Sequence, residues 1–437
     1  MAGVGVAGAL AGCGYRPGGG DLAWESSLGG SGLLGVDERW FLPARDRLFV
    51  VQNQSGRTFD FEADEWREVS SARISAFGPT GDPRLEAETE RQATGAPAVT
   101  ETSILVPVEG DRVTAIDRET AAFDLDDPTA DDDGSKPDEG DAIRWQTEAA
   151  ASADGSTGSD GEATDGDLPV SVAAVRASDR LVAAVRRDDV LVLDAETGDR
   201  AFDLAAAWPA VRESDSGSVA PDRVAVDGED VWVAATGTDA ESGHDDAAVL
   251  ARFGPTGERR VARSLSGGVD WIAVVDGVVV VGDPETDSVT GFDRDLDSPF
   301  ALDVPTPRTR PPVVEGDAPD GVGSRVYLRR GETVRALDVA TGEIAWEHGD
   351  VPASRSFAAA DRGIYALDRR TIRDGGRETR PVIVAVGADG TDRWSAPLPE
   401  GVRVERLFAV GDRLLVVDDG DLYGLRATAG ERWSLTG

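Results

Sequence analysis

Cysteine, methionine, histidine and lysine are almost absent from this sequence of 437 residues. It contains one cysteine, one methionine and two histidines, and Lys136 is its only lysine. A single cysteine excludes an intrachain disulfide and a cysteine-based metal cluster. The histidines, His244 and His348, are too few for a three-histidine metal site, and no Gly-x-Ser-x-Gly sequence accompanies them. The composition therefore predicts no catalytic residue, no cofactor and no metal ligand.

Long apolar runs are also missing. No stretch approaches the roughly 20 continuous apolar residues that a membrane-spanning helix requires. Apolar residues still make up 40% of the chain, mostly valine and alanine, beside 52 glycines and only 6% aromatic residues. Valine-rich runs broken by glycine and aspartate are typical of many short strands joined by tight turns. The composition therefore favours an all-β fold.

Positive charge is scarce relative to negative charge. The chain has 82 acidic and 44 basic side chains, a formal charge of −38, and the acids are spread from end to end. Such a surface repels phosphate backbones, which excludes nucleic acid as a partner. Dispersed carboxylates with almost no lysine resemble the surfaces of proteins from extreme halophiles, where molar salt screens repulsion to within about 3 Å. We therefore expect adaptation to high salt.

Aspartate clusters are the remaining candidates for metal binding. They include Asp131-Asp132-Asp133 and the trio Asp293, Asp295 and Asp297. Neither has the ordered twelve-residue spacing and closing glutamate of a calcium loop. The sequence therefore predicts no specific metal site at either cluster.

The lone cysteine, Cys13, follows an apolar segment near the N-terminus. The sequence Leu10-Ala11-Gly12-Cys13 resembles a lipobox, in which the cysteine thiol receives a lipid, and a glycine-rich stretch follows it. We expect residues 1–20 to be a lipoprotein signal remnant and flexible tether, and residues 21–437 to be the folded body. Lipidation at Cys13 predicts an exported protein on the outer face of the cell membrane, held there only by this anchor.

An internal repeat organises the rest of the chain. The stretch VRALDVATGEIAWE, residues 334–347, joins two alternating apolar stretches through a turn. Comparable stretches recur 40 to 77 residues apart, anchored at Gly81, Ala121, Gly198, Gly257, Asp297, Gly342, Gly390 and Gly430. A further pair of apolar strands precedes each, so a unit has about four strands in roughly 40–45 residues. The sequence predicts an eight-bladed β-propeller of four-stranded antiparallel blades, or seven blades if the degenerate unit around Asp297 joins a neighbour.

The turn of each unit has a physical cause. The Asp338 carboxylate can accept backbone N–H groups two or three residues on, and Gly342 can take the positive φ that a side chain would oppose. Alternation along the next strand then places Ile344 and Trp346 on one face, where a large ring fills the space between adjacent sheets. The equivalent positions are occupied by Trp145, Trp394 and Trp433, with Phe202, Val261 and Ala301 as weaker substitutes.

Two segments depart from the repeat. Residues 126–168 are rich in Asp, Gly and Ser and interrupt the second unit, so we expect a disordered acidic insertion around the strand-like AIRWQTEA. Near the N-terminus, Trp24 lies in DLAWESSL, a copy of the outer strand without its preceding turn. Such a strand suits closure of a ring by joining the last blade. The C-terminal unit keeps its own outer strand, ERWSL, so both remain candidates for that position.

The pattern Ala336-x-Asp338-x-x-x-Gly342-x-x-x-Trp346 fits the tryptophan-docking motif of the pyrroloquinoline-quinone (PQQ) repeat. The chain therefore resembles the PQQ-like propeller superfamily, which includes quinoprotein dehydrogenases and envelope lipoproteins of the BamB type. Dehydrogenases of the family use PQQ with Ca²⁺ and a pair of adjacent cysteines, and this chain has no second cysteine. A lipobox, a short linker and an eight-bladed ring resemble the BamB-type organisation.

We therefore expect a non-catalytic scaffold at the cell surface that binds protein or cell-envelope partners, because propellers present flat faces and exposed outer strands for docking. The alternative from the same resemblance is a quinoprotein-like dehydrogenase or a receptor for a small ligand in the central channel. A fold supports many functions, so the repeat alone does not decide between them.

Overall fold

Short antiparallel strands make up nearly all of the computed structural model, as the alternation in the sequence predicts. The structure describes residues 19–28, 34–44, 46–60, 64–81, 83–118, 142–147, 171–186, 189–208, 221–236, 248–265, 267–315, 323–352, 356–368 and 381–428. Within these residues the helical elements are α1 (Leu204–Ala207) and η2 (Pro221–Arg223).

The strands form eight four-stranded antiparallel sheets, which we number as blades 1 to 8 around the ring. Blades 1 to 4 contain β2 (Leu34–Pro43), β3 (Leu48–Asp60), β4 (Glu65–Phe77), β5 (Pro83–Thr89); β6 (Ala98–Val99), β7 (Ser103–Val108), β8 (Arg112–Asp117), β9 (Ile143–Gln146); β10 (Ala174–Ala177), β11 (Leu181–Val185), β12 (Val190–Asp194), β13 (Arg200–Asp203); and β14 (Val224–Asp227), β15 (Asp230–Thr236), β16 (Ala248–Phe253), β17 (Arg259–Ser264).

Blades 5 to 8 continue the same order. They contain β18 (Trp271–Val275), β19 (Val278–Asp283), β20 (Ser288–Phe292), β21 (Phe300–Asp303); β22 (Val313–Val314), β23 (Arg325–Arg330), β24 (Thr333–Asp338), β25 (Glu343–His348); β26 (Phe357–Ala360), β27 (Gly363–Asp368), β28 (Val382–Gly387), β29 (Asp392–Pro397); and β30 (Arg406–Val410), β31 (Arg413–Asp418), β32 (Asp421–Arg426) with β1 (Leu22–Ser27).

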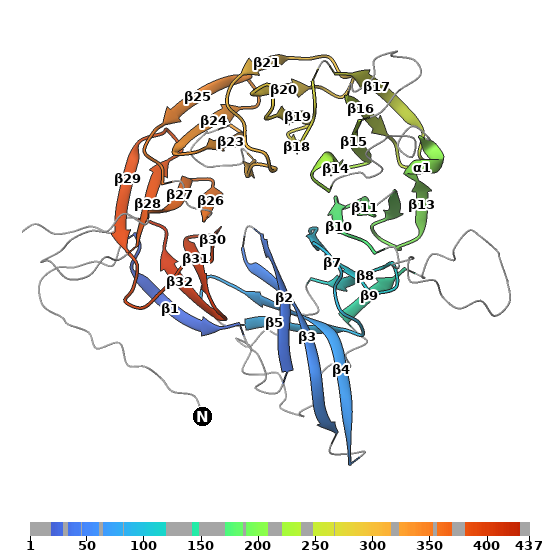
Figure 1. The fold of residues 1–437 in the computed structure, drawn as a ribbon, viewed down its shortest axis with the longest axis vertical. Helices are drawn as coiled ribbons and strands as arrows, with labels where there is room; N and C mark the ends of the chain where they lie inside the picture. The colour runs from blue at the N-terminus through green and yellow to red at the C-terminus, as the bar shows by residue number, and fades with distance from the viewer. Residues whose placement is uncertain are drawn as a thin grey trace, which may run out of the picture.

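The eight sheets stand around a central axis with their first strands innermost (Figure 1). The prediction of an eight-bladed propeller is confirmed, and the seven-bladed alternative is wrong. The unit around Asp297 does not merge with a neighbour, because β18–β21 form a complete sheet of their own. Its turn takes the positive φ at Leu296 (62°) instead of at a glycine.

Alternation along each strand builds the core between blades. In β7, Ile104 and Val106 pack against blade 1, whereas Leu105 between them packs against blade 3. Because successive side chains point to opposite faces, each blade contributes to two interfaces. Eight buried apolar clusters result, one at each junction between neighbouring blades. The fold is therefore held together by sheet-to-sheet packing around a circle.

The N-terminal strand closes this circle. β1 pairs antiparallel with β32, and Leu22 lies opposite Leu425 while Ser27 lies opposite Asp421. Leu28, just after β1, is buried in the cluster between blades 8 and 1. The outer position of blade 8 is therefore occupied by the DLAWESSL segment. The competing segment ERWSL, residues 431–435, lies outside the described residues, as does its Trp433.

The two other predicted segments are only partly described. Within the proposed insertion 126–168, residues 142–147 are described and contain β9, which forms the outer strand of blade 2. The strand-like part of the insertion is thus a regular member of its blade. The other residues of the insertion, and Cys13 with the rest of the predicted tether up to residue 18, lie outside the described residues.

Candidate functional site

The predicted docking motif lies in the β24–β25 hairpin of blade 6. Asp338 ends β24, and its Oδ1 accepts the Thr341 backbone N–H at 3.1 Å. Gly342 has φ 69°, and its N–H donates to the Asp338 carbonyl at 2.9 Å. Ala336 is fully buried and lies opposite Trp346 across the two strands. The four residues therefore fix the turn and aim the indole out of the blade.

Trp346 does not dock within its own blade. Its Nε1 donates to the Ala388 carbonyl in blade 7 at 2.7 Å, and a Cβ at Gly390 would lie 2.7 Å from the indole. Gly342 in turn has the Phe300 ring of blade 5 against it. The glycine of one blade thus receives the aromatic ring of the preceding blade, and the motif stabilises the junctions of the ring.

The same docking recurs at other junctions. Trp145 donates to the Ala195 carbonyl at 3.0 Å and lies against Gly198 of the next blade. Phe202 lies against Gly257 in the same way. In blade 5 the docking residue is Phe300 and not Ala301, the residue expected from the sequence. The one-residue difference follows from the turn of that blade, where Leu296 rather than a glycine has the positive φ.

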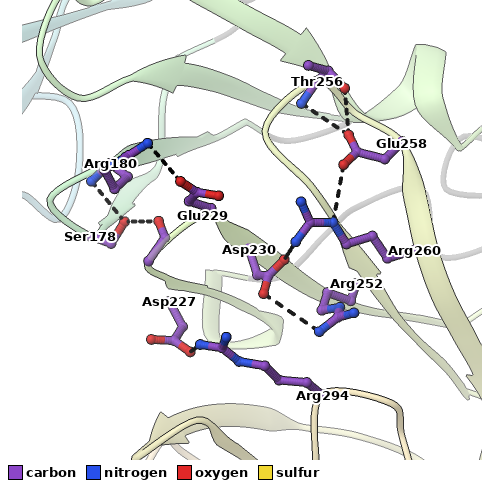
Figure 2. A network of polar contacts seen from close by, with 11 residues as sticks. Ser178, Arg180, Asp227, Glu229, Asp230, Arg252, Thr256, Glu258, Arg260 and Arg294 are labelled. Carbon is purple, nitrogen blue, oxygen red and sulfur yellow. Dashed lines mark hydrogen bonds and ion pairs between the residues drawn. The ribbon is translucent and has the colours of Figure 1, made fainter.

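A network of polar contacts connects the turns of blades 3, 4 and 5 (Figure 2). Arg180 in the β10–β11 turn pairs with Glu229 in the β14–β15 turn at 2.7 Å, and Arg294 of blade 5 pairs with Asp227 at 3.4 Å. The buried Asp230 binds Arg260 at 2.7 Å. These contacts pair opposite charges on neighbouring turns of the three blades.

A pair of carboxyl groups meets in blade 3. Asp189 is buried, and its Oδ1 accepts the backbone N–H groups of Val190 at 2.7 Å and Ala205 at 2.8 Å. Asp203, which caps α1 through the Ala206 N–H, faces it. Burial, followed by the hydrogen bond with Asp203, raises the pKa of Asp189 to about 7. The two carboxyl groups therefore share one proton below neutral pH.

This pair predicts a pH dependence of stability. In the unfolded chain Asp189 has its ordinary pKa of 3.8, so the folded protein retains a proton that the unfolded chain releases. The stabilisation is fully present below about pH 4 and is lost as the pH rises through about 7. Asp189→Asn keeps both accepted hydrogen bonds and offers an N–H to Asp203 without charge. We expect the variant to melt at a higher temperature than the wild type at pH 8 and at nearly the same temperature at pH 4.

Thermal melts in constant molar KCl between pH 4 and 8 measure this difference. Asp199→Asn, which removes an exposed carboxylate from the same blade, is the control. Equal pH profiles for the wild type and Asp189→Asn would show that the two carboxyl groups do not share a proton.

The largest departure from a regular blade is the β3–β4 hairpin of blade 1. Each of its strands has 13 residues, and the hairpin projects beyond the ring (Figure 1). β3 pairs with β4 along its whole length, but β5 pairs with β4 only from Ala72 onward. Among the described residues, the Glu65–Ser70 part of β4 therefore has a neighbouring strand on one side only. Near the tip, Trp66 is 59% exposed and contacts Phe59 edge-on at 5.4 Å between ring centroids.

Comparison with known proteins agrees with the repeat type. A model of PQQ repeats described as "Outer membrane protein assembly factor BamB" matches residues 330–436, from the end of β23 through blade 8. Residues 330–436 are therefore similar to PQQ repeats, and the described residues as a whole form an eight-bladed β-propeller. No curated protein matches its sequence at a significant level.

Solved structures share the propeller's fold at low sequence identity. Sqt1 of Saccharomyces cerevisiae is 7% identical over 94% of this chain and 99% of its own, with a TM-score of 0.51. BamB of Moraxella catarrhalis is 14% identical over 90% of this chain and 100% of its own, with a TM-score of 0.48. A europium-containing methanol dehydrogenase is 12% identical over 91% of this chain and 84% of its own, with a TM-score of 0.46.

The aspartates and histidines that the sequence analysis considered as metal ligands or catalytic groups make contacts within the fold where they are described. In the trio near residue 295, Asp293 Oδ1 accepts the N–H groups of Asp295 and Asp297, both at 2.9 Å, and so caps its own turn. His348 has no partner nearby in the sequence, but in the structure its Nε2 lies 3.3 Å from Asp392 Oδ1 of blade 7. His244 and the Asp131-Asp132-Asp133 cluster lie outside the described residues. Among those described, no group of three metal-ligating side chains is assembled.

No helix within the described residues of the propeller has both the length and the apolar character needed to cross a bilayer.

Proposed function

We propose that this propeller is a non-catalytic scaffold at the cell surface and that its β3–β4 hairpin binds a protein partner. The observation that carries the proposal is Trp66, which is 59% exposed at the end of a hairpin that projects beyond the ring. Tryptophan is among the residues that most often dominate binding energy at protein interfaces. Exposed large apolar side chains are otherwise rare in the described residues, the second being Leu22.

The backbone of the hairpin supports the same role. Along Glu65–Ser70, the outer side of β4 faces away from β3, and no strand of the described part of blade 1 covers that side. An extended segment of another protein can add to such an edge through main-chain hydrogen bonds, with side chains giving specificity.

The family match is consistent with a scaffold. The matching model carries the name of an outer-membrane protein assembly factor, and it covers residues 330–436, from blade 6 to blade 8, but not the β3–β4 hairpin. Our proposal takes from it only the general role of binding proteins at the cell envelope. Lipidation of Cys13 is the proposed anchor. Because β1 is the outermost strand of blade 8, a tether that precedes residue 19 would reach the ring at its rim.

Site-specific cross-linking tests the hairpin. A photo-cross-linking amino acid at position 66, in cells that produce the full chain, is expected to form a covalent adduct with another protein. The same amino acid at position 196, an exposed turn of blade 3, serves as the control. Trp66→Ala is expected to fold normally and to reduce co-purification of the cross-linked partner at least about tenfold. Adducts of equal yield at both positions, or none at position 66, would contradict the proposal.

The dehydrogenase alternative has a direct test of its own. Purified protein in molar KCl with added PQQ and Ca²⁺ is expected to reduce no dye in the presence of alcohols or sugars. Dye reduction that depends on PQQ would overturn the non-catalytic assignment.

A further inference from the structure

A cavity of about 360 Å³ lies between blades 4 and 5, beside their outermost strands. It is lined by the end of β17 with the residues that follow it, and by β19, β20 and β21 of blade 5. Its volume falls within the range of small-molecule sites, about 300–1,000 Å³. Arg263, Ser264 and Ser298 in its wall are exposed, so the cavity opens to solvent.

Alternation along three paired strands gives blade 5 a polar patch on this side. Ser288 lies opposite Asp283, and Thr290 lies between Val281 and Ala301 of the neighbouring strands. Residues that lie opposite one another point to the same face of a sheet. Val281 belongs to the apolar cluster shared with blade 4, so this patch faces blade 4. Its side chains are short, which leaves the space toward β17 unfilled.

Asp283 is a buried charge in the cavity wall, with 5% of the residue exposed. Its Oδ1 accepts the N–H groups of Glu285 at 2.9 Å and Thr286 at 3.3 Å, and its Oδ2 accepts the Thr286 hydroxyl at 2.7 Å. A Cβ at Gly267 would lie 2.5 Å from Oδ2, so the absence of a side chain there leaves room for the carboxylate. A carboxylate has about four acceptor positions, so Asp283 is held in place and can accept one further hydrogen bond.

Arg263 is the second charged residue of the wall. Its Nη1 donates to the Leu296 carbonyl at 2.5 Å, and its guanidinium carbon lies 5.4 Å from the centroid of the Phe292 ring. Within the described part of the chain Arg263 makes no ion pair, so its other N–H groups can donate to a ligand. Asp295 and Asp297 flank Leu296 in the neighbouring turn but do not line the cavity. The wall itself therefore has one positive and one negative charge.

Hydroxyl groups supply most of the remaining hydrogen-bonding capacity. The hydroxyls of Ser264 and Thr290 have no hydrogen-bond partner within the described residues. The Ser288 hydroxyl shares a hydrogen bond of 2.9 Å with the Thr286 hydroxyl. A hydroxyl group both donates and accepts. The cavity therefore offers several donors and acceptors and no net charge.

We propose that this cavity binds the ring of a neutral sugar. A sugar ring carries several hydroxyl groups that both donate and accept, which matches the hydroxyls, the guanidinium and the carboxylate of the wall. Its C–H groups suit the apolar part of the wall, Leu265, Val281 and Ala301. An anion would be repelled by Asp283 and a cation by Arg263, so the wall favours a ligand without charge. The site lies apart from the β3–β4 hairpin and does not depend on the proposed scaffold function.

Ligand-observed NMR tests the cavity with the purified full chain in molar KCl at pH 7. D-glucose, D-galactose and D-mannose are the probes, because they differ only in the direction of single hydroxyl groups. At least one of them is expected to show saturation transfer from the protein and a measurable dissociation constant. The uronic acid and the amino sugar derived from that hexose are expected to bind at least about fivefold more weakly, because each adds a charge near Asp283 and Arg263. No binding of any hexose, or tighter binding of a charged derivative, would overturn the proposal.

Two matched double variants locate the site. Ser264→Ala with Thr290→Val removes two hydroxyl groups of the wall and is expected to weaken hexose binding at least about tenfold, the loss typical of two hydrogen bonds. Ser395→Ala with Thr333→Val makes the same changes at an exposed serine of β29 and a half-buried threonine of β24, and is expected to leave the affinity unchanged. Both variants are expected to melt within about 2 °C of the wild type, because neither loses a side-chain hydrogen bond of the described fold. An unchanged affinity in the first variant, or an equal loss in both, would show that the sugar does not bind in this cavity.

Discussion

Trp24→Ala is expected to lower the free energy of unfolding by about 3 kcal/mol, the scale of removing a packed aromatic side chain. The indole lies in the junction that closes the ring. Its Nε1 donates to the Pro79 carbonyl of blade 1 at 2.6 Å, and it fills the space above Gly81 and Gly424, where a Cβ would overlap it. Alanine therefore removes both the packing and the hydrogen bond that connect β1 to blade 1.

Urea unfolding in molar KCl, followed by tryptophan fluorescence, measures this loss. Trp66→Ala is the matched control, because it removes the same side chain from a 59% exposed position in blade 1. It is expected to change the free energy of unfolding by less than about 0.5 kcal/mol, as surface substitutions generally do. If the two variants lost the same stability, closure of the ring by β1 would contribute nothing to the fold.

Lowering the salt concentration is expected to have the second large effect. The 82 acidic side chains outnumber the 44 basic ones, so 38 negative charges stay uncompensated even if every basic residue neutralises one carboxylate. Their repulsion acts over about 10 Å at 0.1 M salt but only about 3 Å at 1 M. We expect the melting temperature to rise by at least about 10 °C between 0.1 M and 3 M KCl.

Sucrose at matched osmolality separates charge screening from exclusion of the cosolute, since sucrose stabilises proteins without screening charge. It is expected to give a smaller rise than KCl. A melting temperature that does not change between 0.1 M and 3 M KCl would remove the case for adaptation to high salt.

The blades could be predicted because their signals are local. The turn at Asp338 and Gly342 depends on a side chain and a φ angle within five residues, and alternation along a strand decides which residues are buried. Such signals recur in most units, so their count predicted eight blades, or seven if the unit around Asp297 joined a neighbour. The sequence pointed to Ala301, whereas Phe300 is the docking residue. This unit lacks the turn glycine, and without it the pattern does not fix where the turn lies.

The β3–β4 hairpin was missed because its polar residues resemble a turn. The polar sequence QNQSG after Val51 is typical of a turn, yet β3 continues through it to Asp60. Asn53 is buried there, and its side chain exchanges hydrogen bonds of 2.8 Å with the backbone of Ala93, 40 residues away. The partner that allows this polar side chain to be buried comes near it only in the folded protein. No local pattern shows such a partner.

The pairing of β1 with β32 also sets the order in which the molecule can mature. Leu22 meets Leu425, so this contact joins residues 403 positions apart and cannot form before residue 425 has been synthesised. Contacts of such long range are slow to form, and until then the edge of β32 and the apolar side of blade 1 stay open to other chains. A nascent or truncated chain that lacks either end would therefore be the species most prone to aggregate, although seven complete sheets are already in place.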